Sequence, residues 1–467
     1  VYANDEALEF FTRAIESYEK LRHDLTADRV SGPRRPPGAG SLKKNLSGTE
    51  LKRKRKYLEA LLYRGNIFTG TGEVEKAEDD LKRGLVLAEE LADRKPLIDY
   101  LLQLSHLCLI VGDVVKVHEY SSRALMLSRR AGEKMCHAES LNNLGYVNYV
   151  QGNYSRGLSN FKQALKLQRR LNYIEGIAKS LNNLGVLYFN RGNLKKSLEL
   201  SNESVEICEK TGNLLGKANG LNNIGYIHFS LGNYHEALNY FKESLVLEKS
   251  IGNKRGYAIT LKNIGEINFS LEEKEEAVTN YKEALAIFNE IGDNESRVIC
   301  KYYLGRAYIA LEKFTDARNF LNTAKFLAEK LKFEGVFGII YNALAELNLT
   351  CYTVRNDRRK LTEASRIINK AIDFSKKHKS QETFAETCVL AGRIYSALGK
   401  DPIKYFKKSI NIFKALGILF ELGKAYYYYS IVLKRIGNKK ASEINMRKAE
   451  VTLNEINRVE WLKKKVN

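Results

Sequence analysis

Apolar and polar positions alternate with helical spacing along most of the chain. Over residues 141–151 the apolar side chains recur every three or four positions, which predicts an amphipathic helix. Gly152-Asn153 interrupts this pattern with residue types that tolerate a positive φ. A second amphipathic helix is predicted over about 154–171. Together the two segments predict a helical hairpin.

The hairpin pattern recurs at a fixed interval of 40 residues. The run Leu-Asn-Asn-Leu-Gly at 141–145 returns at 181–185, returns with Ile in fourth place at 221–225, and returns as Lys-Asn-Ile-Gly after Leu at 261–265. Small residues recur in step, and they would let the two helices of a hairpin approach closely while large neighbours fill the gaps. A single hairpin cannot bury its apolar face, whereas stacked hairpins share one continuous core. The period therefore predicts an all-α solenoid.

These motifs resemble the tetratricopeptide repeats. That family has Leu-Gly in helix A, a Gly-Asn-Tyr turn and an aromatic residue in helix B, and Leu144-Gly145, residues 152–154 and Phe161 match it. The Trp that is usual in helix A is Leu here, and the period of 40 exceeds the usual 34. The period is similar to that of Pins/LGN-type scaffolds and of arrays attached to bacterial signal-transduction ATPases. The resemblance implies a right-handed superhelix of stacked antiparallel helix pairs, with helices A on the concave surface.

The repeat frame also divides the chain. The expected divisions are a half repeat, the helix B of a truncated repeat (1–24), a Pro/Gly-rich and then basic linker (25–57), seven regular 40-residue units (58–337), three irregular units with an insertion near 352–360 (338–456) and a capping tail that contains Trp461 (457–467). Because the chain starts with a half repeat and without Met, we expect it to begin inside a longer signalling protein.

Composition narrows the class of protein. No stretch approaches 18 uncharged apolar residues, so we expect no membrane-spanning helix. The polar start carries no secretory signal. Six Cys occur without CxxC spacing, which favours a reducing, cytoplasmic compartment and argues against a disulfide framework or a metal site. We also expect no cofactor.

The charge is uneven along the chain. The net charge of +21 arises mostly from residues 353–467, which carry +15, whereas residues 58–352 carry +1. One interpretation is a basic surface for an acidic partner or a nucleic acid, on which Tyr426–Tyr429 could stack. The other is that Lys covers solvated helix faces. The basic run Lys52–Lys56 is likewise interpreted as a solvated helix start.

Catalytic signatures are missing from the sequence. It has no GxxxxGK[ST], GxSxG or HExxH motif, and its glycines have places in the repeat frame. The sequence therefore predicts a binding protein and no enzyme.

One amide position stands out in the repeats. Asn is unfavourable within helices because its side chain competes for backbone hydrogen bonds, so its recurrence suggests a use. By resemblance, the second Asn of each pair lies on the concave surface, where it could hold a peptide backbone by donating and accepting. The alternative is that these amides bridge neighbouring repeats. The residues concerned are Asn143, Asn183, Asn223 and Asn263.

Positions further along helix A would set specificity. The side chains expected to contact a partner are Tyr146, Tyr226, Glu266 and Arg306. The predicted function is a protein-interaction scaffold that binds a peptide or partner segment on the helix-A surface. We expect it to be the sensor or regulatory part of a larger signalling protein, with the partner either a separate protein or another domain of the same chain. The alternative is binding of a nucleic acid or an acidic partner through the basic residues 353–467.

Overall fold

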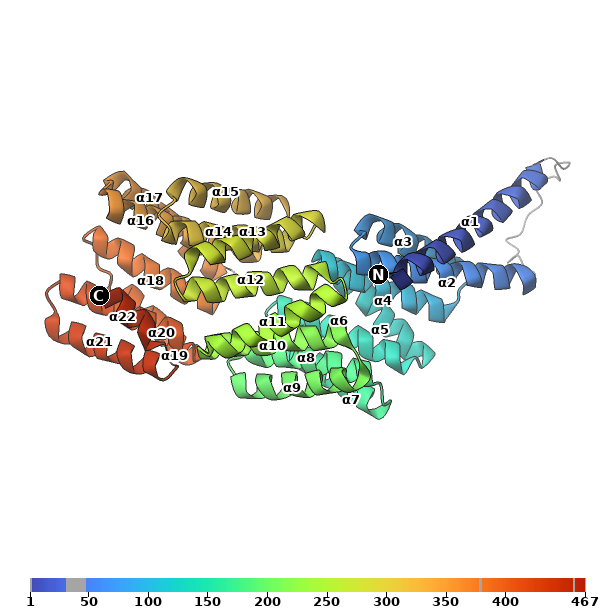
Figure 1. Cartoon of the computed structure of the whole chain (residues 1–467), viewed down its shortest axis with the longest axis horizontal. Coiled ribbons are helices and arrows are strands. Elements are labelled where there is room, and N and C mark those ends of the chain that lie inside the picture. Colours follow the sequence, from blue (N-terminus) through green and yellow to red (C-terminus); the bar gives the residue numbers. More distant parts are fainter. Residues whose placement is uncertain (1, 31–47, 378–379, 457, 467) are drawn as a thin grey trace. The chain divides into compact units, whose positions relative to one another are not determined.

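The protein is described by a computed structural model that covers residues 2–30, 48–377, 380–456 and 458–466. Every regular element in these ranges is a helix, and the helices pack mainly against their neighbours in chain order (Figure 1). This confirms the predicted all-α solenoid. The Pro/Gly-rich stretch at 31–40 lies outside the described residues.

The helices form hairpins of a helix A and a helix B. The helices A are α2 (Gly48–Thr71), α4 (Arg94–Val111), α6 (Lys134–Val150), α8 (Ile174–Asn190), α10 (Leu214–Leu231), α12 (Lys254–Ser270), α14 (Asn294–Ala310), α16 (Phe337–Arg355), α18 (Gln381–Ala397) and α20 (Leu419–Arg435). The helices B are α3 (Val74–Glu90), α5 (Val114–Ala131), α7 (Tyr154–Arg170), α9 (Leu194–Thr211), α11 (Tyr234–Ser250), α13 (Lys274–Glu290), α15 (Phe314–Lys330), α17 (Arg358–Lys377), α19 (Ile403–Leu416) and α21 (Lys439–Asn454). Helix α1 (Tyr2–Val30) precedes them, α22 (Val459–Val466) follows them, and a 3-10 turn (Glu334–Val336) precedes α16.

Helix and turn lengths explain the period of 40 residues. In a regular hairpin such as α6–α7, both helices have 17 residues, and three residues separate successive helices. Small and large residues face each other where the helices cross. A Cβ atom added to Gly225 would lie 2.7 Å from the ring of Phe241, and one added to Gly265 would lie 2.6 Å from the ring of Tyr281. Glycine is thus needed there because a large ring fills the crossing point.

In two segments the helix bounds depart from those of the regular repeat. Helix α2 begins at Gly48, so the basic run 52–56 lies on a helix and not in a linker, because Lys, Arg, Leu and Glu favour helix. Near the expected insertion, α16 has 19 residues and α17 has 20, and only Asn356 and Asp357 separate them. The extra residues therefore lengthen two helices instead of forming a loop.

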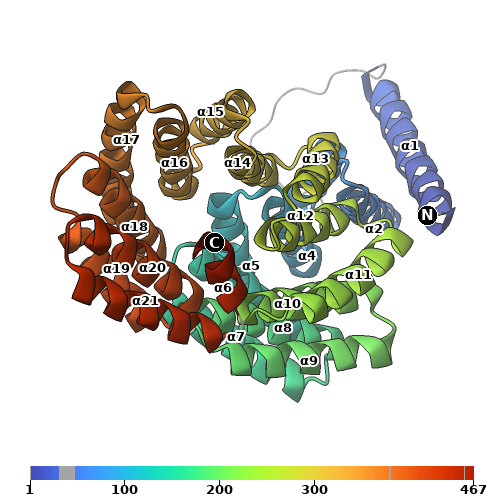
Figure 2. The same cartoon turned by 60° about the vertical axis from the view of Figure 1, so that its left-hand side comes forward.

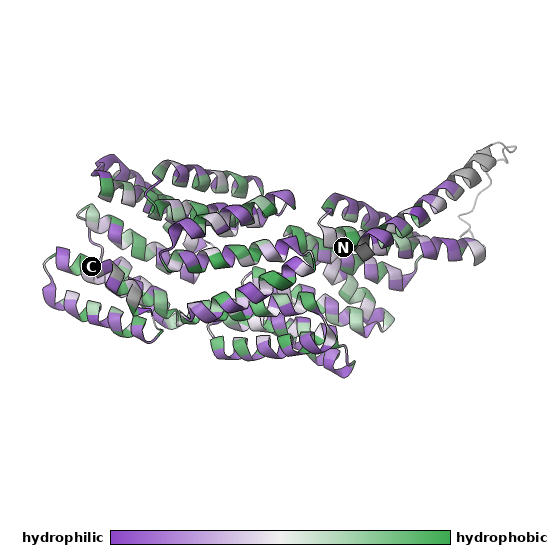
Figure 3. Ribbon diagram, in the orientation of Figure 1, coloured by the Kyte–Doolittle hydropathy of each residue, from purple (hydrophilic) through white to green (hydrophobic). Residues whose placement is uncertain are grey.

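The chain divides into two compact units. Unit 1 consists of Val1–Asn183 with Ile251–Asn253, and unit 2 consists of Leu184–Ser250 with Lys254–Asn467. Along the helices of each unit, hydrophobic and hydrophilic residues are interleaved (Figure 3), as expected of helices that bury one face. Within the described ranges, none of the helices combines the length and the apolar character that crossing a membrane requires.

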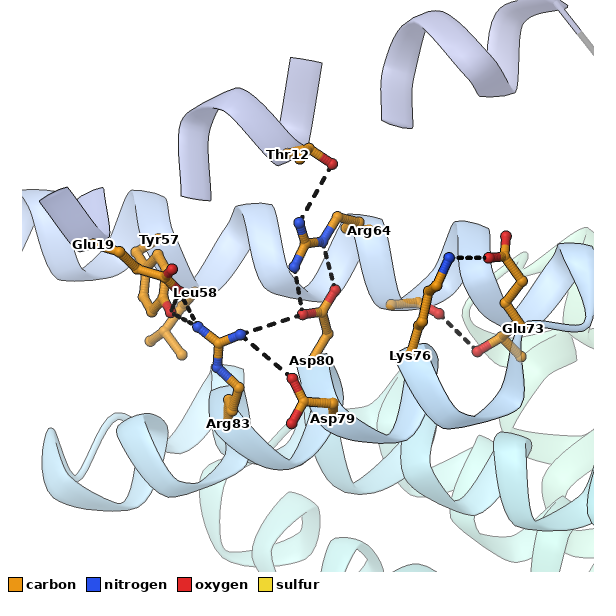
Figure 4. A network of polar contacts seen from close by, with 12 residues as sticks. Thr12, Glu19, Tyr57, Leu58, Arg64, Glu73, Lys76, Asp79, Asp80 and Arg83 are labelled. Atoms are coloured by element: carbon orange, nitrogen blue, oxygen red, sulfur yellow. Dashed lines mark hydrogen bonds and ion pairs between the residues drawn. The ribbon is translucent and has the colours of Figure 1, made fainter. Parts of the chain in front are cut away.

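In unit 1, polar contacts attach α1 to the first hairpin (Figure 4). The guanidinium of Arg64 in α2 donates to both carboxylate oxygens of Asp80 in α3, at 2.7 and 2.8 Å. Arg64 also donates to the hydroxyl of Thr12 in α1 at 3.3 Å, and Glu19 of α1 pairs with Arg83 of α3. The paired Asp80 side chain is only 1% exposed, so this ion pair is part of the core.

In unit 2, the helices A lie on the inner side of the stack (Figure 2). Each helix A from α10 to α20 contacts the helix A before or after it, whereas no comparable pair of helices B occurs in the described ranges. A stack in which one row of helices is closer together than the other curves toward the closer row. The inner face of unit 2 is therefore lined by helices A.

Candidate functional site: the inner face of helices A

The eight predicted contact residues are divided between the two units. Unit 1 contains three of them and unit 2 contains the other five. Those in unit 1 are Asn143, Asn183 and Tyr146, and those in unit 2 are Asn223, Asn263, Tyr226, Glu266 and Arg306. The predicted set spans both units, and each unit is considered separately.

In unit 1, the amides at the repeated position connect neighbouring repeats. Asn143 Nδ2 of α6 donates to Ser105 Oγ of α4 at 3.1 Å, and Asn142 Nδ2 donates to Ser180 Oγ of α8 at 2.8 Å. The side chains of Asn142 and Asn143 are 1% and 5% exposed. Their donors are therefore engaged within the stack.

In unit 2 the same position has the same use. Asn263 Nδ2 of α12 donates to Asn222 Oδ1 of α10 at 2.9 Å, and Asn222 itself donates to Thr260 Oγ1. Asn263 is also 5% exposed. The geometry of Asn143 and Asn263 favours the alternative in which these amides bridge repeats, because a buried amide that already has a partner offers little to a peptide.

Tyr226 belongs to an aromatic group on helices A. Its ring lies 5.3 Å from that of Phe189 in α8 and 5.8 Å from that of Phe229 in α10. Such edge and tilted ring contacts add to the stability that burial provides. Tyr226 is half-buried and so keeps part of its surface on the inner face.

Glu266 lies beside a cation and a ring. Its Oε1 is 2.6 Å from Nζ of Lys262, one turn earlier in α12, and that ammonium is 5.3 Å from the ring centroid of Tyr303 in α14. Burial raises the pKa of the Tyr303 hydroxyl well above its ordinary value, and the Glu266 carboxylate raises it further. Lys262 stands at the first and Tyr303 at the second of the two positions that carry Asn in the regular repeats.

Arg306 lies over two aromatic rings. Its guanidinium carbon is 5.4 Å from the ring centroid of Phe269 and 5.7 Å from that of Tyr302. Tyr302 raises the pKa of Arg306 above its ordinary value and Glu346 raises it further, against the lowering effect of burial. Arg306 therefore stays a cation on the inner face.

Glu346 and Arg393 continue the charged surface along α16 and α18. Arg393 Nη1 lies 3.3 Å from Glu346 Oε1, and its guanidinium carbon is 4.4 Å from the ring centroid of Tyr428 in α20. Burial raises the pKa of Glu346, but Arg393 and Arg306 outweigh it, so the pKa is lower than usual. Glu346 is consequently an anion between two cations.

Three further carboxylates lie close together on α18 and α20. Burial, and after it the carboxylates of Glu421 and Glu382, raise the pKa of Glu386 to about 8 against the lowering effect of Lys424 and Arg306. Burial and Glu421 also raise the pKa of Glu382. Lys424 Nζ is 2.8 Å from Glu421 Oε1. Glu386 therefore holds its proton at neutral pH, beside two further carboxylates.

Sequence reasoning missed Glu346, Glu386, Arg393 and Lys424. Two of them could have been predicted from the sequence, because Glu346 follows Ala345 and Arg393 follows Gly392, as Arg306 follows Gly305. Following the residue after the small helix-A position through the irregular repeats would have found them. Glu386 and Lys424 lie earlier in their helices, at a position that the regular repeats do not mark.

The fold defines the class of protein: an α-solenoid of stacked helix pairs. The model of the tetratricopeptide repeat family matches residues 136–210, 176–247, 216–290 and 256–329. Residues 136–329 are therefore similar to the tetratricopeptide-repeat family. No curated protein has a sequence that matches this chain.

Solved structures with the same fold are only distantly similar in sequence. The apo form of the quorum sensor NprR from B. thuringiensis is 15% identical, with a TM-score of 0.52 over 77% of this chain and 99% of that one. A signal-transduction ATPase with numerous domains and a tetratricopeptide repeat sensor, from Pyrococcus horikoshii, is 16% identical. Its TM-score is 0.51 over 83% of this chain and 55% of that one. These likenesses show the fold.

Within the described ranges, no group of three or more His, Cys, Asp and Glu side chains is arranged to hold a metal ion. All six cysteines are buried thiols. The chemistry that the inner face offers is charge, hydrogen bonding and aromatic surface.

Proposed function

We propose that unit 2 binds a segment of a partner protein or peptide on the inner face of its helices A, and that this makes the chain a sensor or regulatory scaffold. The observation that carries the proposal is the run of charged side chains over aromatic rings from α12 to α20. Lys262, Arg306 and Arg393 all lie within 6 Å of ring centroids. Such surfaces recognise peptides through ion pairs and flat apolar contacts.

The surface also indicates the chemistry of the partner segment. Because Glu382, Glu386 and Glu421 repel one another, a cation placed among them would be attracted and would favour the ionised form of Glu386. We therefore propose a segment with a Lys, an Arg or a free amino group, and with an aromatic or aliphatic neighbour.

The roles of the predicted residues follow from their contacts. Tyr226, Glu266 and Arg306 remain proposed contact residues, and Glu346, Glu386, Arg393 and Lys424 are added. Asn143 and Asn263 are proposed to bridge repeats, and the shared repeat position proposes the same for Asn183 and Asn223. Tyr146, 37% exposed on α6 of unit 1, is proposed as a separate contact residue.

Two further points concern the setting of this function. The two solved structures described above are named as a quorum sensor and a sensor-bearing ATPase, which supports a sensory role for a solenoid of this kind. The reduced, buried cysteines support a cytoplasmic location.

The nucleic-acid alternative has less support. Of the tyrosines that could stack on bases under this alternative, Tyr426, Tyr427 and Tyr429 are 5%, 6% and 8% exposed. Stacking on bases requires an accessible ring face, so these side chains serve the core.

The proposal is tested with the full chain and a positional-scanning pool of short synthetic peptides, read by fluorescence anisotropy. Glu386→Gln and Arg393→Gln are compared with Glu206→Gln, which changes an exposed carboxylate of helix B α9. We expect peptides with a cation to bind the wild type and the Glu206 variant, and to bind the other two weakly. Equal binding to all four proteins, or no binding by any peptide of the pool, would contradict the proposal.

A further inference from the structure

Arg458 is enclosed by three aromatic rings that lie far from it in sequence. Its guanidinium carbon is 4.1 Å from the ring centroid of Tyr234, 4.4 Å from that of Phe420 and 5.5 Å from that of Phe229. Its Nη2 donates to the backbone carbonyl oxygen of Phe229 at 3.0 Å, and the residue is only 6% exposed. The segment before α22 is thereby joined to the turn between α10 and α11, within unit 2.

The same turn is shaped to receive this segment. Gly232 has a φ of +86°, and a Cβ atom added to it would lie 2.3 Å from the carbonyl oxygen of Ile456. Further along, Lys465 Nζ lies 3.6 Å from a carboxylate oxygen of Glu272, in the turn between α12 and α13. Contacts on two separate hairpins indicate a defined docking position and not a chance approach.

The docked segment also covers part of the proposed binding face. The ring of Trp461 in α22 lies 5.9 Å from that of Phe420, 5.4 Å from that of Tyr427 and 6.4 Å from that of Tyr428. Tyr428 is the ring under Arg393, and Phe420 lies 5.2 Å from Nζ of Lys424. Trp461 therefore contacts rings that also contact two cations of the site.

We infer that Ile456 and residues 458–466, here called the latch segment, close unit 2 by inserting Arg458 into the cage of Phe229, Tyr234 and Phe420, and that this closure controls access to the inner face. The control of access rests on the function proposed above, whereas the closure does not. A partner segment that carries a cation beside an apolar residue competes for the surface that Arg458 and Trp461 occupy.

The Arg458 contacts are of a kind that can be released. Burial lowers the pKa of Arg458 to about 10, and its Nε has no hydrogen-bond partner in the described ranges. A buried cation without full hydrogen bonding loses part of the stabilisation that it would have in water. Closure and opening are therefore closer in free energy than they would be with a fully paired guanidinium.

Trp461, the only Trp in the chain, reports on the latch segment directly. Its emission maximum and its quenching by acrylamide are measured in the full chain, with far-UV circular dichroism as the check on folding. Arg458→Ala removes the guanidinium, and Arg447→Ala, at an exposed position of α21, is its control.

A second pair of variants tests the same contact from the other side. Gly232→Ala and Gly437→Ala place a side chain at almost the same backbone angle, because the two φ values are +86° and +85°. Only the Gly232 variant meets Ile456, since nothing lies within 4 Å of a Cβ atom at Gly437. The difference between the two variants isolates the docking contact from backbone strain.

We expect Arg458→Ala and Gly232→Ala to shift the Trp461 emission to longer wavelength and to raise its quenching constant about twofold, as local opening does. The two controls should leave both quantities unchanged. Folded Arg458 and Gly232 variants with wild-type Trp461 quenching would overturn the closure, whatever the outcome of the peptide experiment.

Control of access is tested with the cation-bearing peptides of the same synthetic pool. Arg458→Ala should bind them more tightly than the wild type and the Arg447 variant do. Release of Trp461 without tighter binding would overturn the control of access while leaving the closure in place. If the peptides fail to bind any of the proteins, control of access is overturned together with the proposed function.

Discussion

The regular repeats and the irregular repeats use equivalent helix-A positions in different ways. Where the sequence repeats, Asn143 and Asn263 are buried and hydrogen-bonded to the preceding repeat. Where the repeat departs from this pattern, the first of the two amide positions carries Lys262 and then Tyr302, and the position after the small residue carries Glu346 or Arg393. The comparison suggests that residues which stay constant from repeat to repeat form the contacts between repeats. Positions at which the residue varies are available to contact a partner.

The largest expected effect is the loss of peptide binding when the charged face is altered. Arg393→Gln removes the cation that pairs with Glu346 and covers Tyr428. We expect affinity for cation-bearing peptides to fall about 30-fold, or ~2 kcal/mol, because the guanidinium that orients Glu346 and covers the Tyr428 ring is lost, and with it the flat contact for the apolar neighbour of the peptide's cation. Anisotropy titration measures the change. Unaltered affinity would mean that the irregular repeats do not form the site.

A loss of stability is expected when a bridging amide is removed. Asn263→Ala leaves Asn222 Oδ1 without its donor inside the stack, which should lower the free energy of unfolding by about 1–3 kcal/mol. Asn202→Ala, at an exposed position of α9, is the control and should change it little. Urea unfolding followed by circular dichroism measures both. A stable Asn263 variant would remove the distinction between the two kinds of repeat.

A smaller effect concerns pH. Because the pKa of Glu386 is raised to about 8 in the folded protein, the folded state holds a proton that the unfolded state releases above its own lower pKa. Stability is therefore lost as the pH rises through this interval toward about 8. Glu386→Gln should reduce this dependence of stability on pH. The Tm of the variant should therefore exceed that of the wild type by about 1–3 °C at pH 8 and by less at pH 5. If Tm changed with pH in the same way in the two proteins, the raised pKa of Glu386 would be contradicted.

The same ionisation should affect binding. A cation-bearing peptide favours ionised Glu386, so its affinity for the wild type should rise between pH 6 and pH 8 and level off above the raised pKa. The Glu386→Gln variant should lack this rise. Titrations in matched buffers at each pH provide the measurement. If affinity depended on pH in the same way in both proteins, Glu386 would not be part of the binding site.

The smallest expected effect comes from restoring the repeat. Lys262→Asn returns the residue that the regular repeats have at 142, 182 and 222. The side chains of Lys262 and Glu266 are only 17% and 11% exposed, and the amide introduced at position 262 can donate in place of the ammonium. We expect the fold to keep its stability and peptide affinity to fall about twofold to fivefold. A large loss of stability would show that Lys262 supports the stack.

The solenoid could be predicted from the sequence because the same local pattern occurs in many successive repeats. Leu-Asn-Asn-Leu-Gly, the glycine turn and the aromatic residue of helix B recur in step, so single ambiguous positions matter little. The same repetition leaves the role of the constant Asn open between a peptide contact and a bridge between repeats. A constant Asn suggests a shared function, and the sequence alone does not tell whether its partner is a peptide or Ser105 of the preceding repeat.

The contacts of Arg458 and Trp461 could not be predicted from sequence patterns of this kind. The contact between Arg458 and Phe229 spans 229 residues, and it depends on how far unit 2 curves. Curvature accumulates from small rotations between repeats, which no local motif encodes. Trp461 was expected to cap the stack, but its neighbours Phe420 and Tyr428 could not be derived from spacing.

The central claim is that repeated helix-A residues serve the stack and that non-repeated ones bind a partner. The most direct test measures stability and peptide affinity together for Asn263→Ala and Arg393→Gln in the same buffer. The account predicts that the Asn263 variant loses stability and keeps its affinity below its unfolding transition, whereas the Arg393 variant loses affinity and keeps most of its stability. The reverse result, with peptide binding lost in a stable Asn263 variant and kept in the Arg393 variant, would contradict it.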